Sequence, residues 1–275
     1  MSTSTAIALL LAGLSTILTN LAYLREHDAA AALPVLSMRR PLHSARILLE
    51  DRSWMLGFLM ETGGFLLYAA ALALASLALV QSVAAGGIGV LAYISARVAR
   101  RRLSRRELSG VLVSVFGLAA LAVSLAGGSG EGGNGSIAAI LLWLGVTAGA
   151  ALVVLAAGRR LGGAVADGIA GGLFFSIGDV STKVVTQGGA RVGFLVTLIL
   201  GYTLGTALLQ VGYQSGSALA VAGIATLLTN AIPIAAGTIV LDEPVPSGAL
   251  GGLRLFAFAS VTIGAVLLAR PKHTV

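Results

Sequence analysis

Cysteine is absent from the sequence, which excludes disulfides, zinc–thiolate sites and iron–sulfur clusters. Charged residues are scarce: they make up 11% of the 275 residues, against about 25% in a soluble globular protein. The three histidines, His27, His43 and His273, all lie outside the long apolar segments. No glycine-rich phosphate-binding loop with a Lys-Ser or Lys-Thr pair occurs. A His-based metal enzyme and ATP-driven pumping are therefore unsupported.

Long apolar segments recur from one end of the chain to the other, and 57% of the residues are hydrophobic. Each segment is near the roughly 20 residues that cross a hydrocarbon core of about 30 Å. Lipid leaves exposed backbone groups without partners, so such segments must be helices or a closed barrel. They are twice as long as the roughly ten-residue strands of a barrel and do not alternate. The predicted fold is all-α: a polytopic helical membrane protein forming a single membrane domain over residues 1–275.

Nine membrane-spanning helices are predicted. Their approximate ranges are 3–24, 54–74, 77–97, 108–127, 137–157, 164–185, 192–212, 217–240 and 250–269. The N-terminal segment lacks the basic region of a signal peptide, so it is expected to be a retained first span. Turn and breaker residues fill the connections, most clearly in GGSGEGGNGS, residues 127–136.

The basic residues are divided unevenly between the two sides of the membrane. With nine spans, fifteen of the 18 lie on one side: Arg25, Arg39, Arg40, Arg46, Arg52, Arg97, Arg100, Arg101, Arg102, Arg105, Arg106, Arg159, Arg160, Arg270 and Lys272. Cytoplasmic loops hold the excess of Lys and Arg, which predicts a plasma-membrane protein with its N-terminus outside and its C-terminus in the cytoplasm. The net charge of +7 comes from basic loop residues, which are expected to set the topology and to contact anionic lipid headgroups. No nucleic-acid partner is expected. The segment 39–54 predicts a short amphipathic helix on the cytoplasmic surface.

Two stretches of the sequence resemble each other. Tyr213 follows Tyr68 by 145 residues, and Gly264 follows Gly117 by 147 residues. This shift moves each helix by five spans, an odd number, so the second copy is inverted in the membrane. The predicted organisation is a first repeat over 1–127 (spans one to four), a reversing fifth span over 137–157 and a second repeat over 164–269 (spans six to nine). Inverted repeats are typical of secondary transporters, whose substrate site lies near the midplane.

Glu61 lies inside the apolar run GFLMETGGFLLYAAALAL, residues 57–74. It is about eight residues into the second span, which at 1.5 Å per residue places it roughly 12 Å from the cytoplasmic end of that span. Ionisable groups at such depth are costly and usually face a bundle interior or a water-filled cavity. Glu61 is therefore the candidate for ion coupling or for direct contact with a metal cation. The alternative is a protonated glutamate that hydrogen bonds to a neighbouring helix.

Further polar residues within the spans are candidates for a transport path. Asp179 and Lys183 lie four residues apart on one face of span six, so they form either an ion pair or part of the path. In LLTNAIPIAAG, Asn230 and Pro233 predict a local break, with the amide meeting the freed backbone groups.

Four more residues are assigned to the two mouths of that path. Gln81 is near the outer end of span three, and Gln210, Tyr213 and Gln214 are near the inner end of span seven. Tyr68 and Tyr213 are equally compatible with interfacial anchors. Asp242 and Glu243 are expected in a solvated outer loop.

The end of the sequence resembles the drug/metabolite transporter (DMT) superfamily of EamA-like proteins. In that superfamily a proline-bearing apolar helix precedes a Leu-x-Glu loop and a glycine-bearing last helix, and Leu241, Glu243 and Gly264 fit. A closer resemblance is to the NIPA-type magnesium transporter branch. The matching residues are Glu61, Phe65 and Tyr68, then Ser176, Gly178 and Lys183, then Gln210 and Tyr213. The chain departs from that branch at three places. Gly64 stands where the branch has Asn, and Gln214-Ser215 stands where it has Leu-Asn. The Pro that follows the tyrosine in the branch is absent after Tyr68.

The resemblance implies a secondary transporter that moves a small solute or cation by alternating access, with Mg²⁺ as the leading substrate. Metabolite or drug export is the alternative within the superfamily. Outside it, the alternative is a lipid translocase or a membrane scaffold that transports nothing. Neither enzymatic activity nor a bound cofactor is expected. Membrane lipids are expected partners, and the duplicated halves are compatible with a monomer or a homodimer.

Overall fold

The computed structural model describes residues 3–84, 104–125, 133–158, 162–243 and 248–269. All regular structure in these ranges is helical, which confirms the predicted all-α class for the described part of the chain. In chain order the helices are α1 (Thr3–Ala32), α2 (Pro41–Glu50), α3 (Arg52–Leu74), α4 (Leu77–Ala84), α6 (Arg105–Leu125), α7 (Ile137–Ala156), α9 (Gly163–Thr186), the 3-10 helix η1 (Gly189–Phe194), α10 (Leu195–Tyr213), α11 (Ala218–Val240) and α12 (Ala249–Ala269).

Within the described ranges, six helical segments are long and apolar enough to cross a membrane. They are α1, α3, α7, α9, α10 with its preceding η1, and α11. The chain is therefore a multi-pass helical membrane protein. The fourth and ninth predicted spans coincide with α6 and α12, each of 21 residues. Of the third predicted span only residues 77–84 are described, so the count of nine and the inverted repeat stay predictions.

Several elements of the topology prediction lie outside the described residues. They are most of the third span, residues 127–132 of the glycine-rich connection, and the basic residues Arg97, Arg100, Arg101, Arg102, Arg159, Arg160, Arg270 and Lys272.

Helix α1 is longer than the predicted first span, because it ends at Ala32 and not near residue 24. The charged stretch Arg25–Asp28 ends the apolar run, so hydropathy predicts a loop there. Alanine has the highest helix propensity, and four alanines follow this stretch at 29–32. The helix ends two residues before Pro34, which disfavours helical geometry in the residue that precedes it. Glu26 consequently lies on a helix that packs within the bundle.

The short helix predicted within residues 39–54 is present as α2, which begins at Pro41, a residue pre-organised for the first helical position. Its Arg46 Nε donates to Glu50 Oε1 at 2.8 Å, and this exposed contact raises the pKa of the Arg46 guanidinium. Exposed pairs of this kind contribute little stability. Asp51 then ends α2 and caps α3 by accepting a hydrogen bond from the Trp54 amide at 2.7 Å. The position of α2 on a membrane surface stays a prediction.

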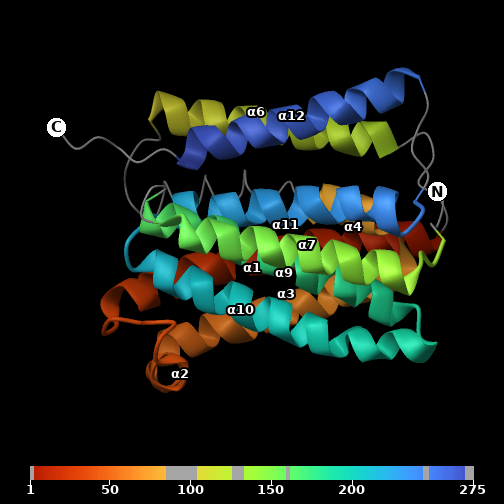
Figure 1. Ribbon diagram of the computed structural model, residues 1–275. Helices are drawn as coiled ribbons and strands as arrows, with labels where there is room; N and C mark the ends of the chain where they lie inside the picture. Colours follow the sequence, from red (N-terminus) through yellow and green to blue (C-terminus); the bar gives the residue numbers. More distant parts are fainter. Residues whose placement is uncertain (1–2, 85–103, 126–132, 159–161, 244–247, 270–275) are drawn as a thin grey trace.

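Figure 1 shows the long helices running roughly along a common direction, with α6 and α12 together on one side and α3 and α10 on the other. Helix α9 lies between them and packs against α7, α10 and α11, while α1 packs against α3. Almost all of α9 from Ala170 to Thr182 is buried. The core of the protein is therefore built around α9.

Glycines allow α9 to approach its neighbours closely. At Gly201 on α10, an added Cβ would lie 2.7 Å from Gly178 N and 2.8 Å from Phe174 O, both in the backbone of α9. At Gly172 on α9, it would lie 2.8 Å from Ala225 Cα on α11. Small residues at helix interfaces provide this close packing in membranes, where helix association has little hydrophobic driving force.

We expect Gly201→Ala to destabilise the bundle by about 1–3 kcal/mol, the usual cost of overpacking, because the added methyl meets backbone atoms that cannot move aside. The matched control is Gly145→Ala on α7, where an added Cβ has nothing within 4 Å. Thermal unfolding in detergent measures both. Equal melting temperatures for the two variants would contradict the close α9–α10 packing.

Candidate functional site

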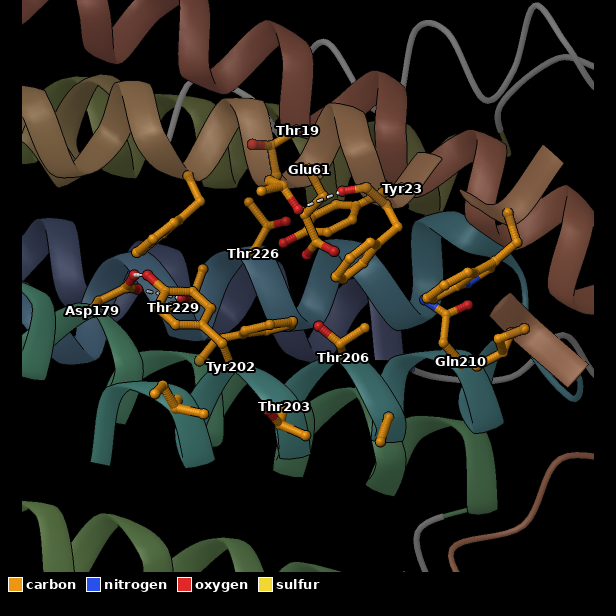
Figure 2. A pocket seen from close by; sticks show the side chains of 18 of the residues that line it. Thr19, Tyr23, Glu61, Asp179, Tyr202, Thr203, Thr206, Gln210, Thr226 and Thr229 are labelled. Atoms are coloured by element: carbon orange, nitrogen blue, oxygen red, sulfur yellow. Dashed lines mark hydrogen bonds between the residues drawn. The ribbon is translucent and has the colours of Figure 1, made fainter. Parts of the chain in front are cut away.

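A cavity of about 520 Å³ lies inside the bundle. Its walls come mainly from α1, α3, α9, α10 and α11, and Figure 2 shows some of the side chains that line it. Gln81 and Asp179 lie among its lining residues, and so do Leu48 on α2 and the segment 36–38 before it. The predicted site residues that line it are Glu61, Tyr68, Gln81, Asp179, Gln210 and Asn230; Lys183 and Tyr213 do not.

Asp179 is the centre of a hydrogen-bond network at one end of the cavity. Its carboxylate accepts from Tyr202 OH at 2.5 Å and from Thr229 Oγ1 at 2.6 Å, and Figure 2 shows these three side chains together. Gln81 Nε2 donates to Tyr68 OH at 2.6 Å, and both residues line the same cavity as Asp179. Donors on α10 and α11 thus converge on one carboxylate of α9.

Lys183 has a different environment from Asp179. Its Nζ donates to the carbonyl oxygens of Leu72 at 3.0 Å and Ala75 at 2.9 Å, at the end of α3. The last carbonyls of a helix lack intrahelical partners, and a lysine satisfies them well. The structure therefore gives Asp179 and Lys183 separate partners, and it places Lys183 at a helix terminus.

Glu61 has a second carboxylate beside it, which the sequence analysis missed. Glu26 on α1 is fully buried and lies close enough to Glu61 on α3 for their charges to interact. Gly57 makes room for it, since a Cβ there would lie 2.7 Å from Glu26 Cγ. Gln210 Nε2 donates to Glu26 Oε2 at 2.5 Å. Two adjacent carboxylates repel when both are charged, so the pair favours a shared proton or a bound cation.

A periodic signal in the sequence could have revealed Glu26. Thr16, Asn20, Tyr23 and Glu26 follow one another at spacings of four, three and three residues. This is the spacing of one helix face, and a polar face continuing to Glu26 indicates a helix that continues that far.

Two asparagines line the cavity in the same local geometry. Asn20 Nδ2 donates to Thr16 O at 2.8 Å, and Asn230 Nδ2 donates to Thr226 O at 2.5 Å. Each amide nitrogen is thus bound to the carbonyl four residues earlier in its own helix. Helix α11 runs without interruption through Pro233, so the predicted local break is wrong. The Asn230 amide binds the Thr226 carbonyl, whereas Pro233 frees that of Thr229.

Glu243 was expected in a solvated loop, but it is only 5% exposed. Its Oε1 accepts from the Leu77 amide at 2.9 Å, at the start of α4. A carboxylate at a helix N-terminus is favourable because the amide groups there lack intrahelical acceptors. Asp242, in contrast, is exposed. Tyr213 is buried, and its ring packs edge-on against that of His27 on α1.

The side chains available as metal ligands limit the ways in which a metal could bind. Among the described residues, no group of three or more His, Cys, Asp or Glu side chains could hold a metal ion. A cation in this cavity would therefore meet the carboxylate of Glu61 or of Asp179 together with neutral oxygens and water. Mg²⁺ suits such a set, because it is commonly bound through one or two carboxylates and keeps several waters.

The fold and the cavity define the chain as a multi-pass helical membrane protein with an interior cavity that carboxylates line. The chain is similar to a protein of Arabidopsis thaliana described as a probable magnesium transporter, NIPA9, with 26% identity over 274 residues, covering 90% of this chain and 78% of the relative. No family model and no solved structure matches the chain.

We expect Lys183→Met to lower stability by about 1.5–3 kcal/mol, because it removes charged hydrogen bonds from the end of α3. It should leave cation binding in the cavity unchanged, since Lys183 does not line it. Thermal unfolding and equilibrium binding of Mg²⁺ on the same preparation measure both. Loss of binding with unchanged stability would place Lys183 on the path.

Proposed function

We propose that the protein is a secondary transporter that moves a divalent cation, with Mg²⁺ as its substrate, through the central cavity. The observation that carries the proposal is the position of Glu61 in that cavity beside a second buried carboxylate, Glu26. Unpaired negative charge inside hydrocarbon is costly, so a buried carboxylate pair marks an ion path or a proton relay. The similarity to a probable magnesium transporter supports the choice of cation.

The position of the cavity supports access from one side. Its lining includes Met38, Pro41 and Leu48, which belong to the segment that also carries Arg39, Arg40 and Arg46. Under the positive-inside rule this segment is cytoplasmic, so the described conformation corresponds to the inward-facing state of an alternating-access cycle. The inverted repeat of residues 1–127 and 164–269 provides the two halves that would exchange access.

Each acidic residue has a distinct role in this proposal. Glu61 contacts the cation, and Glu26 adds negative charge behind it. Asp179 attracts cations electrostatically, while Tyr202 and Thr229 hold its carboxylate in place. No covalent step is involved, and binding energy supplied by the cation stabilises a different arrangement of the halves.

A second candidate is export of an organic cation. The volume of about 520 Å³ falls within the range of roughly 300–1,000 Å³ that is typical of small-molecule sites. The carboxylates would then recognise an ammonium group. Efflux of a fluorescent organic cation from proteoliposomes, without Mg²⁺ flux, would favour this candidate.

We expect Glu61→Gln to reduce Mg²⁺ uptake into proteoliposomes about 10- to 100-fold, because the cation loses a charged oxygen contact worth about 1.5–3 kcal/mol. An entrapped magnesium indicator measures the uptake. The matched control is Glu50→Gln, the same change at an exposed position on α2. Uptake by Glu61→Gln at the parent rate would contradict the role given to Glu61. Absence of uptake by the parent protein would contradict magnesium transport itself.

A further inference from the structure

The central cavity is open to the outside of the protein. A residue that lines a cavity and is also exposed marks the place where the cavity opens. The exposed residues of the described lining belong to three elements: Met38, Pro41, Ala45 and Leu49 in α2 and the segment before it, Phe58 and Thr62 on α3, and Ile199 and Thr203 on α10. The opening therefore lies between α3 and α10 and extends to α2.

The opening between α3 and α10 faces lipid. Both helices belong to segments that are long and apolar enough to cross a membrane. The rings of Phe65 on α3 and Tyr202 on α10 pack edge-on, with their centroids 4.9 Å apart. On the α2 side of this ring pair, the lining includes Phe58, which is 36% exposed, and Leu49, which is 55% exposed. Hydrocarbon chains of the surrounding lipid therefore meet the cavity directly.

The cavity surface near this opening suits a hydrocarbon chain. The surface of the cavity as a whole is largely apolar. The rings of Trp54 and Phe58 stack with their centroids 5.2 Å apart, and Leu48 and Leu49 line the same part of the cavity. Water needs about two to four polar partners to stay in a cavity, and an empty apolar space forfeits van der Waals contacts. A lipid chain restores those contacts without needing polar partners.

Positive charge lies at the same end of the cavity. Residues 39–52 hold four arginines and two acidic residues, which leaves a net positive charge. Arg39 and Arg40 are exposed and lie in the chain between Met38 and Pro41, which line the cavity. Figure 1 shows α2 beside the start of α3, and the two helices are in contact. Under the positive-inside rule this end is cytoplasmic, where basic groups attract anionic lipid headgroups.

We propose that this opening is a binding site for one anionic phospholipid of the cytoplasmic leaflet. The phosphate of the lipid lies against Arg39 and Arg40, and one acyl chain enters the cavity between α3 and α10, past Leu49 and Phe58. The apolar opening holds the chain, and the arginines select the charge of the headgroup. The site goes beyond the proposed function and does not depend on it, because the lipid binds whether or not a cation is moved.

Tryptophan fluorescence tests this site, because the chain has two tryptophans, Trp54 in the cavity lining and Trp143 on α7 outside it. Trp143→Phe leaves Trp54 as the single reporter. The whole chain is reconstituted in phosphatidylcholine vesicles with rising fractions of phosphatidylglycerol whose acyl chains carry bromine, a short-range quencher. Brominated phosphatidylcholine is titrated in the same way. We expect phosphatidylglycerol to quench Trp54 at a lower fraction than phosphatidylcholine does.

Arginine variants test the selection of the headgroup. Arg39→Gln and Arg40→Gln should each lower the preference of Trp54 quenching for phosphatidylglycerol about fivefold, the effect of one basic residue at a membrane surface. The matched control is Arg105→Gln, the same change at an exposed position on α6, which Figure 1 shows on the opposite side of the molecule from α3 and α10. This control should keep the preference of the parent.

Leucine variants test the entry of the acyl chain. Leu49→Gln places a polar group in the opening and should weaken the quenching of Trp54 by both lipids. Leu42→Gln makes the same change on α2 at a residue that is 87% exposed and outside the cavity lining, so it should be quenched like the parent. Trp54→Phe leaves Trp143, which reports ordinary contact with lipid and should be quenched alike by both headgroups.

Each contrary outcome overturns a stated part of the proposal. Absence of Trp54 quenching by either lipid would overturn the entry of a chain into the cavity, and equal quenching by both would overturn a site selective for anionic lipid. Equal losses in Arg40→Gln and Arg105→Gln would overturn the role of the arginines. Equal losses in Leu49→Gln and Leu42→Gln would reduce the site to an amphipathic helix lying on the membrane. Absence of Mg²⁺ uptake would overturn the proposed function and leave the lipid site standing.

Discussion

The close packing of α9 against α10 and α11 is the constraint on which the rest of the structure depends. Gly172 and Gly201 let these backbones come into contact, and only at this separation can Tyr202 and Thr229 reach Asp179 with hydrogen bonds of 2.5 and 2.6 Å. A larger residue at either glycine would move a whole helix, and with it one donor of the network. Backbone packing and the polar site are therefore one feature of the structure.

The acidic residues of the interior lie in two different settings. Tyr202 and Thr229 donate hydrogen bonds to Asp179 and satisfy its carboxylate, whereas Glu61 lies beside a second buried carboxylate, Glu26. Burying charge in a low-dielectric interior is expensive unless the charge is paired. The neighbouring carboxylates of Glu26 and Glu61 therefore favour a cation over an anion.

The class of fold followed from the sequence, because length, hydropathy and the scarcity of charge leave few alternatives in lipid. Glu61 was identifiable for the same reason, as a carboxylate within an apolar run. Glu26 was not, because hydropathy ended the first span at Arg25, whereas the helix continues to Ala32. Asp179 and Lys183 have separate partners because α3 ends beside Lys183. The four-residue spacing within α9 carries no information about where another helix ends. Likewise, Asn20 and Asn230 are 210 residues apart, and only the fold brings them to one cavity.

The central claim is that the cavity binds a divalent cation at Glu61. Mn²⁺ replaces Mg²⁺ in sites built from carboxylates, carbonyls and water, and it is paramagnetic. Electron paramagnetic resonance of Mn²⁺ titrated into the nanodisc-embedded protein would report how much of the ion is bound. The account predicts binding that Mg²⁺ displaces and that Glu61→Gln weakens. Absence of binding, or binding that Glu61→Gln leaves unchanged, would contradict it.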